Sequence, residues 1–340
     1  MGGDNLLSKD FDLRRLQLIE LDALRDVQAV CARHALPLFL IGGSALGAVR
    51  HKGFIPWDDD VDLALYRDDY MKFLNYAADE LPKDKYFLQT VENDPGYHLP
   101  YLKLRLNGTV YCEKVFEHRE THKGIFLDIY PIDAVPEDPN RRKKQKYAAL
   151  AAYFFFRGEP IKKQGKAINL ASRIALRVLT KKRKRRLGFY FQSRVPIYDL
   201  ESAKSVANIY GIKQYDKEIM PKAYFGQGTK AEFEGLEVTV PAEYDAYLTH
   251  LYGDYMQLPP ESERVLKHDA VEVDFGPYAG PEAAAADEPD GPSAASGTDV
   301  DAVQDADAIE SDTGIDADAS DDDETAPVPY IPKPLEEDED

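Results

Sequence analysis

The spacing of apolar residues along the chain predicts alternating helices and strands as far as Glu80, followed by further strands as far as Tyr130. Helical spacing or helix caps mark three segments, Phe11–His34, Ala45–Arg50 and Arg67–Glu80. Short apolar runs predict strands at Leu38–Ile41, Asp58–Leu65, Leu102–Leu106, Thr109–Cys112 and Gly124–Tyr130. Asn107-Gly108 favours a hairpin between the strands on either side of it. Pro131 is expected to end the last strand, and Asp133 then falls in a turn.

The second half of the chain predicts further helices. Lys143–Phe156 ends in the aromatic cluster Tyr153–Phe156, and Ala167–Thr180 places Ile168, Ala171, Ile174, Ala175 and Val178 on one face. The basic run Lys181–Arg186 follows directly. Beyond it we expect a strand at Phe233–Val240 and helices at Tyr244–Tyr252 and Glu261–His268.

Charge is distributed unevenly over the 340 residues, whose formal net charge is −19. Residues 279–340 carry 21 acidic residues and one basic residue, whereas residues 1–278 carry 41 basic and 40 acidic ones. This acidic tail has one aromatic residue, Tyr330, and too little apolar surface to offset its chain entropy, so we expect it to be disordered. Within the folded part, residues 140–194 hold 18 Lys and Arg against one acid, Glu159. We therefore expect a domain at 1–278 with a basic helical insertion at 140–194, and a tail at 279–340.

Several classes of protein are disfavoured by the same sequence. A transmembrane helix needs about 18 consecutive apolar residues, and the chain has no such run. The first 15 residues lack the charged-then-apolar pattern of a signal peptide and the Ser or Thr that myristoylation prefers. Two cysteines, Cys31 and Cys112, make neither a disulfide framework nor a zinc cluster. We expect a cytoplasmic protein, since a reducing compartment suits this cysteine usage.

Carboxylates gather in the segment IPWDDDVDLALY. Because side chains of a strand alternate between its faces, Asp58, Asp60 and Asp62 are expected on one face, opposite Asp59 and the apolar Val61 and Leu63. Adjacent carboxylates repel one another, and a divalent cation removes that cost. Oxygen ligands select Mg²⁺ or Mn²⁺, so the pattern predicts a metal site. The alternative is a solvated acidic turn, which the surrounding apolar residues disfavour.

A glycine turn precedes the acidic segment. Gly42-Gly43-Ser44 closes a predicted strand and opens a helix that Ser44 can cap, and such a helix N-terminus offers N–H donors to phosphate. By itself, a Gly-Gly-Ser sequence is often only a tight turn and does not bind phosphate. Combined with Asp60-Val61-Asp62, it indicates nucleotide chemistry. Arg50 lies between the two motifs and can reach the same phosphates or form a surface salt bridge.

Three further features complete the candidate site. Asp128 is a lone carboxylate in an apolar strand and needs a partner, which a metal shared with Asp60 and Asp62 would provide, although a cap or salt bridge is also possible. Lys103 and Arg105 alternate on one strand face and either flank a phosphate-bearing donor or are solvated. Arg264 and His268 share a face of the predicted helix and either bind phosphate or form a surface pair.

These motifs resemble the LicD/fukutin family of phosphotransferases, within the nucleotidyltransferase superfamily. The segment LIGGSALGAVRHKGFIPWDDDVDLALYRDDYMKF resembles the first block of that family, GIFLDIYPID its second, and FEGLEVTVPAEYDAYLTHLYGDYMQLPPESERVLKH its C-terminal block. The resemblance implies an α+β fold with a nucleotidyltransferase-type mixed β-sheet flanked by helices. The tail and the length of the basic insertion are not part of it.

The resemblance implies transfer of phosphocholine or a polyol phosphate from a CDP-linked alcohol donor to a hydroxyl of a surface glycan or lipid-linked glycan, such as lipopolysaccharide or teichoic acid, with release of CMP. Asp58, Asp60, Asp62 and Asp128 would hold one or two Mg²⁺, and Asp128 could also accept the proton of the acceptor hydroxyl. Gly42, Gly43, Ser44 and Arg50 would bind phosphate. One alternative is a nucleotidyltransferase that moves NMP from an NTP, and another is a non-catalytic scaffold at a membrane.

The basic insertion suggests anionic partners. Its amphipathic helices, with Lys, Arg and Phe, fit the surface of an anionic membrane better than nucleic acid, since no nucleic-acid-binding module is visible. An anionic glycan, an intramolecular contact and a merely solvated face are the alternatives. We therefore expect no nucleic-acid partner and a peripheral location on the inner face of the cell membrane.

Overall fold

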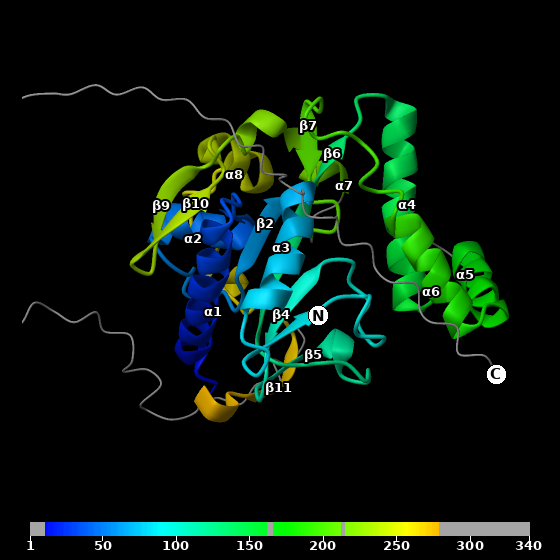
Figure 1. Ribbon diagram of the computed structural model, residues 1–340, viewed down its shortest axis with the longest axis horizontal. Coiled ribbons are helices and arrows are strands. Elements are labelled where there is room, and N and C mark those ends of the chain that lie inside the picture. Colours follow the sequence, from blue (N-terminus) through cyan, green and yellow to red (C-terminus); the bar gives the residue numbers. More distant parts are fainter. Residues whose placement is uncertain (1–10, 162–165, 212–214, 279–340) are drawn as a thin grey trace, which may run out of the picture.

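The structure is a computed structural model that describes residues 11–161, 166–211 and 215–278 (Figure 1). The acidic tail predicted for 279–340 and the N-terminal residues 1–10 lie outside the described residues. In the described part of the chain, none of the helices has both the length and the apolarity needed to cross a bilayer.

A mixed β-sheet carries the fold, with the strand order β1-β2-β6-β4-β3. Its strands are β1 (Phe39–Leu40), β2 (Asp62–Tyr66), β6 (Phe126–Val135), β4 (Leu102–Leu106) and β3 (Tyr86–Gln89). β2 and β6 are parallel, and the other pairs in this order are antiparallel. The far end of β6 pairs with β7 (Ser205–Ala207), which pairs with β8 (Met220–Pro221). The predicted α+β fold with a mixed sheet flanked by helices is confirmed.

Helices pack over the sheet (Figure 1). α1 (Leu13–Arg33) begins where the Asp12 side chain accepts a hydrogen bond from the Arg15 N–H, and it buries the apolar stripe that the sequence predicts. α1 and α3 (Arg67–Glu80) pack against each other and against the sheet. α2 (Gly42–His51) packs against α8 (Tyr244–Tyr252) and the hairpin of β9 (Thr229–Phe233) and β10 (Leu236–Val240). α7 (Tyr215–Glu218) also contacts α8.

Several predicted elements differ in the structure. The prediction of a hairpin at Asn107-Gly108 is wrong. β5 (Val110–Glu113) pairs with β11 (Ala270–Asp274), and β4 lies between β3 and β6. The strand predicted over Phe233–Val240 is the hairpin β9–β10, which turns at Glu234-Gly235 with positive φ at both residues. Only Glu261–Glu263 of the predicted last helix forms a helical turn, of the 3₁₀ type. A strand-like sequence can thus find its partner far along the chain, which local pattern does not reveal.

Pro131 does not end its strand. β6 continues to Val135, and Pro131 pairs with Leu65 of the parallel strand β2. On its other edge, β6 pairs with β4 as far as Ile129 and with β7 from Asp133, so the proline lies in the interval between two partners. Asp133 is therefore a buried strand residue instead of a turn residue, and Arg67 donates two hydrogen bonds to it, of 2.7 and 2.6 Å.

The region around residues 140–194, which we call the basic helical region, contains in its described part the helices α4 (Pro139–Arg157), α5 (Lys166–Val178) and α6 (Lys181–Gln192). Asp138 caps α4, Pro139 occupies its first turn, and Gly158 ends it in the left-handed conformation. α4 packs against α6 through the stacked rings of Phe155 and Phe191. Most of the predicted helix boundaries here hold, but the basic run Lys181–Arg186 is itself helical, with Thr180 as its cap.

Candidate active site

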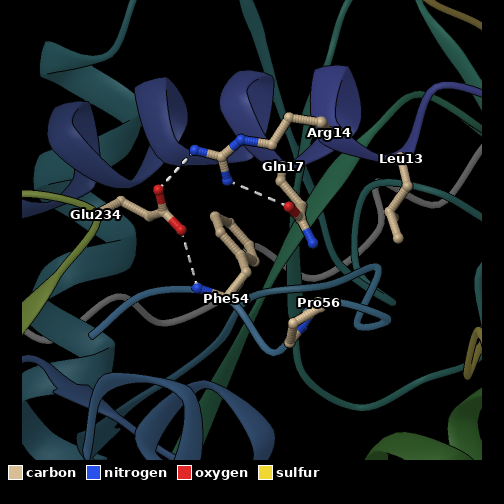
Figure 2. Close-up of a pocket in the computed structure, with 6 residues that line it drawn as sticks. All are labelled: Leu13, Arg14, Gln17, Phe54, Pro56 and Glu234. Carbon is tan, nitrogen blue, oxygen red and sulfur yellow. Dashed lines mark hydrogen bonds and ion pairs between the residues drawn. The ribbon is translucent and has the colours of Figure 1, made fainter. Parts of the chain in front are cut away.

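The acidic segment is held by the start of α1. Gln17 donates a 2.9 Å hydrogen bond to the backbone carbonyl of Asp58. Figure 2 shows Arg14 paired with Glu234 of the β9–β10 turn, while the other Glu234 oxygen accepts a hydrogen bond from the Phe54 N–H. A Cβ at Gly53 would lie 2.3 Å from that oxygen, so a larger residue would have to displace the Glu234 carboxylate. The loop before the carboxylates is thus fixed from two sides.

The glycines at the start of α2 lie directly against two carboxylates. A Cβ on Gly43 would lie 2.7 Å from Asp58 Oδ2, and one on Gly42 would lie 3.2 Å from Asp62 Oδ2. Gly42 also has a φ of +55°, which other residues adopt at a cost. The positive end of a helix dipole favours negative charge at this position. Two glycines therefore let carboxylates approach the first turn of a helix where larger residues would block them.

Ser44 is not the N-cap of α2 that the sequence predicted. α2 begins at Gly42, and the residue before it is Ile41, whose side chain cannot accept a hydrogen bond. Ser44 is buried in the helix, and its Oγ accepts a 2.8 Å hydrogen bond from the Asp62 N–H. The Gly42 N–H donates to the Tyr247 hydroxyl at 2.9 Å. Ser44 thus sets the start of β2, and α8 supplies a tyrosine to the turn.

One row of side chains crosses four neighbouring strands. Asp62 on β2 is in register with Asp128 on β6, Asp128 with Lys103 on β4, and Lys103 with Gln89 on β3. Residues in register point to the same face of a sheet. The ammonium group of Lys103 lies 2.8 Å from Asp128 Oδ1, and the Tyr130 hydroxyl donates to the other oxygen at 3.3 Å. Parallel pairing of β2 and β6 is what brings Asp62 and Asp128 side by side.

Lys103 and Arg105 are buried, not solvated as an edge strand would have them. Lys103 is 1% exposed and lies over the Phe126 ring, 3.3 Å from its centroid. Arg105 is fully buried and donates to the Gln89 side chain and the Gly124 carbonyl. Both cations approach Glu113 of β5, at 3.5 and 3.4 Å. Burial raises the pKa of Glu113, but Lys103 and Arg105 outweigh it and lower that pKa overall.

Asp59 belongs to a second cluster, with His268. The predicted strand begins only at Asp62, so strict alternation does not apply to Asp59, which is fully buried. Its carboxylate accepts hydrogen bonds from the Tyr111 hydroxyl at 2.7 Å, from the Lys267 and His268 N–H groups at 3.2 Å each, and from the His268 ring at 3.3 Å. Burial opposes the charge of Asp59, but these hydrogen bonds lower its pKa.

His268 is partly buried, with 16% of its side chain exposed. Burial disfavours its protonation, but the hydrogen bond with Asp59 and the charges of Asp60 and Glu113 raise its pKa to about 10. Ligand atoms of Asp59, Asp60 and His268 lie within 4.8 Å of one another. Because metal-bound imidazole must be neutral and the Asp59 oxygens are already hydrogen-bonded, this group is better described as an ion-pair cluster than as a metal centre.

We call Asp58, Asp60, Asp62 and Asp128 the carboxylate cluster. Burial, with Asp60 and Asp59, raises the pKa of Asp58 to about 7. Burial raises the pKa of Asp60 to about 6; Asp59 and Asp128 add to this rise, and His268 opposes it. The pKa of Asp62 is raised well above its usual range by burial and by Asp60 and Asp128. Mutual repulsion and burial therefore make the fully charged cluster costly without a cation.

The donor set of this cluster fits a divalent cation. Asp62 Oδ1 is buried and accepts no hydrogen bond from any residue that the structure describes. Carboxylate oxygens are the ligands that Mg²⁺ and Mn²⁺ prefer, and a cation between them would remove the repulsion. Asp58, Asp60, Asp62 and Asp128 could hold such an ion, with Lys103 as the existing counter-charge of Asp128.

Glu20 is a component of the site that sequence reasoning missed. It lies on the buried face of α1 and is 1% exposed, with one oxygen that is buried and accepts no hydrogen bond from the described residues. Burial raises its pKa well above the usual range, and Asp60 and Asp59 add to the rise. A signal was present, since Glu20 lies four residues from both Leu16 and Leu24 within an apolar helical stripe.

The remaining predicted residues lie at the rim. Arg50 lies in the last turn of α2, donates a 2.6 Å hydrogen bond to the Tyr255 carbonyl and lies within electrostatic reach of Asp58. Arg264 donates to the Pro259 carbonyl, and its guanidinium lies 5.5 Å from the centre of the Trp57 ring. Arg264 and His268 do not share a helix face, because the chain between them is not helical. His268 contacts the buried Asp59, whereas Arg264 lies near Trp57 in the loop that carries the carboxylates.

Comparison with known proteins supplies the family. The family model described as "LicD/FKTN/FKRP, nucleotidyltransferase domain" matches residues 35–157. The "Lipopolysaccharide cholinephosphotransferase LicD" of Haemophilus influenzae is 32% identical over 276 residues, which cover 76% of this chain and 97% of that protein. The chain belongs to the LicD family. The resemblance predicted from the three sequence blocks is thereby confirmed.

Two further relatives match a part of this chain. Uncharacterized proteins of Rickettsia typhi and Rickettsia prowazekii are 27% and 25% identical over 154 and 141 residues. These matches cover 42% and 38% of this chain, and 46% and 47% of the two relatives. The residues that match the LicD family model include the whole carboxylate cluster, Lys103 and the α2 turn, whereas His268 lies beyond them.

Proposed function

We propose that this LicD family protein transfers a phospho-alcohol unit, phosphocholine in the first place, from a CDP-linked donor to a hydroxyl of a cell-surface glycan and releases CMP. Polyol phosphates are the alternative cargo. The observation that carries the proposal is the carboxylate cluster, which packs against the N-terminal turn of α2 through Gly42 and Gly43. The extended similarity to a lipopolysaccharide cholinephosphotransferase supports the choice of cargo and acceptor.

Each group of residues around the carboxylate cluster would have its own role in the reaction. The carboxylate cluster would hold Mg²⁺ or Mn²⁺, which supplies charge neutralisation for the diphosphate of the donor. Arg50 and the first turn of α2 lie beside this cluster and would orient phosphate oxygens. His268 and Asp59 would hold Asp60 in place, since His268 is a cation at hydrogen-bonding range of Asp59 and close to Asp60.

The chemical step exchanges one phosphorus–oxygen bond for another. The hydroxyl oxygen of the glycan forms a bond to the phosphorus of phosphocholine, and the bond between that phosphorus and CMP breaks. The proton of the hydroxyl passes to a carboxylate, for which we propose Asp128, held by Lys103 and Tyr130. Positioning and charge stabilisation would supply most of the acceleration. Cys31 and Cys112 are free and buried, which supports a reducing compartment, and we assign the reaction to the cytoplasm.

Release of CMP tests the proposal. The full chain is incubated with CDP-choline, CDP-ribitol or CDP-glycerol, each with Mg²⁺ and a glycan acceptor, and CMP and the modified glycan are measured. We expect CMP from one donor, loss of the reaction with EDTA, and loss in the Asp60→Asn and Asp128→Asn variants. The matched control is Asp79→Asn, an exposed acid of α3.

Two outcomes would contradict the proposal. Pyrophosphate release from an NTP, with none of the CDP-alcohols consumed, would identify a nucleotidyltransferase instead. If Asp60→Asn and Asp62→Asn leave Mg²⁺ binding and every activity unchanged, the carboxylate cluster is not an active site. Isothermal titration with Mg²⁺ measures the binding directly and does not depend on the choice of donor.

A further inference from the structure

Helix α5 presents an apolar stripe to solvent. Leu170, Ile174 and Val178 follow one another at intervals of four residues, and 59%, 55% and 72% of their surfaces are exposed. Residues spaced by four lie on one face of a helix. The opposite face carries Ser172 and Leu176, which are buried. α5 is therefore held against the protein by one side and exposes apolar side chains on the other.

Arginines and lysines border this stripe. Arg173 and Arg177 are exposed and immediately precede Ile174 and Val178, so they lie along one edge of it. Lys181 and Lys182, at the start of α6, are exposed just beyond its end. Residues 160–194 contain neither Asp nor Glu. The face thus combines protruding aliphatic groups with cations and has no nearby acid in the sequence to neutralise them.

Four phenylalanines of the basic helical region have a different role. Phe155 stacks on Phe191, and Phe156 contacts the Phe189 ring edge to face, so these rings join α4 to α6. They are therefore not the membrane-facing group that the sequence suggested. Figure 1 shows α5 at the outer end of the region, on the side away from the sheet and α1. Its exposed stripe is thus placed where a large flat partner can reach it.

We infer that the exposed face of α5 docks on an anionic lipid bilayer. Leu170, Ile174 and Val178 enter the boundary between headgroups and acyl chains, and Arg173, Arg177, Lys181 and Lys182 lie against lipid phosphates. An interfacial helix has this composition, with an apolar face bordered by Lys and Arg. Nucleic acid would use the cations but leaves the apolar stripe in water. A second copy of α5 would bring like charges together. The inference does not rest on the proposed transferase activity.

Vesicle binding of the full-length protein tests this inference. The probes are vesicles of phosphatidylcholine alone and vesicles with about 30% phosphatidylglycerol, where adjacent cations add to the attraction. The main variant is L170Q/I174Q/V178Q, which keeps good helix formers at exposed positions. A second variant is R173Q/R177Q. The matched controls are V115Q/L258Q, which removes exposed apolar residues elsewhere, and K204Q/K230Q, which removes exposed cations elsewhere. Circular dichroism verifies that each variant folds.

We expect binding to the anionic vesicles that weakens as salt rises. L170Q/I174Q/V178Q should lower the partition coefficient by about 10-fold or more and R173Q/R177Q by several-fold, with both controls close to the parent. Absence of binding at low salt overturns the inference, as does equal binding by the triple variant and the parent. Light scattering that shows a dimer dispersed by the triple variant, without vesicle binding, also overturns it and identifies a second copy as the occupant.

Discussion

The carboxylate cluster and the basic helical region each gather charges of one sign, but they lie in opposite environments. Asp60 and Asp128 are 8% and 2% exposed, whereas Lys181, Lys182 and Arg183 lie at the surface. Water and salt screen the exposed cations, which therefore need no specific partner. The buried carboxylates repel one another at low dielectric, and their raised pKa values express that cost. A count of charges does not distinguish the two regions. Their burial does, because like charges repel strongly only where water is excluded.

Loss of a cluster carboxylate should have the largest effect. We expect Asp62→Asn to lower kcat by about 10³-fold, as removal of a preorganised charge-stabilising group does. Because the change also relieves repulsion, the variant should unfold at a higher temperature than the parent in EDTA. CMP release and thermal unfolding measure the two effects. Mg²⁺ should raise the melting temperature of the parent and not of the variant. Unchanged activity, or a lower melting temperature in EDTA, would contradict this account.

Removal of a buried counter-charge should be costly where removal of an exposed one is not. Lys103→Met leaves Asp128 buried without its ammonium partner and should lower the free energy of unfolding by about 3–5 kcal/mol. Lys204→Met removes an exposed lysine, 77% accessible, that pairs with Glu137, and should change it by about 0–1 kcal/mol. Urea denaturation measures both. Similar losses in the two variants would show that burial does not distinguish the two pairs.

Substitution of two glycines, one beside the carboxylate cluster and one in the basic helical region, tests which of these regions is needed for activity. A Cβ at Gly43 would lie 2.7 Å from Asp58 Oδ2, and one at Gly188 would lie 2.6 Å from the Phe156 ring. Gly43→Ala should displace Asp58 and slow CMP release by about 10-fold. Gly188→Ala should separate α4 from α6 and lower the free energy of unfolding by about 1–3 kcal/mol, with activity retained. Activity loss in Gly188→Ala but not in Gly43→Ala would reverse the assignment of the two regions.

His98 should give an effect that is limited to acidic pH. Its buried ring contacts Phe116 and Tyr153 of α4. Burial, followed by the charges of Arg119 and Arg157, lowers its pKa to about 3. The folded pKa lies below the unfolded one, so His98 is neutral at no cost above pH 6.5. Stability then falls as the pH drops from 6.5 toward 3, by about 2 kcal/mol at pH 5. His98→Phe should remove this part of the pH dependence of urea unfolding; an unaltered profile would exclude His98 as its source.

Elements with strong local signals were well predicted from the sequence. Helices α3 and α8 have the predicted boundaries, and α1 and α4 differ by a few residues at their ends. Asp60, Asp62 and Asp128 lie close together, as their motifs indicate. The family resemblance is confirmed by a relative that matches over 97% of its length. These successes share a cause, since helical periodicity, caps and a short acidic motif are all legible within a few residues.

The sequence could not predict contacts between residues that lie far apart along the chain. Lys103 was open to two interpretations until β4 was seen beside β6, which puts its ammonium group against Asp128. Glu20, Glu113 and His268 reach the site from α1, β5 and the segment before β11. Their roles depend on strand order and packing, because Coulomb energies follow distance in space and local dielectric. The sequence therefore determines the residue types and the short-range elements, whereas the counter-charges and the burial around the carboxylate cluster arise only from the fold.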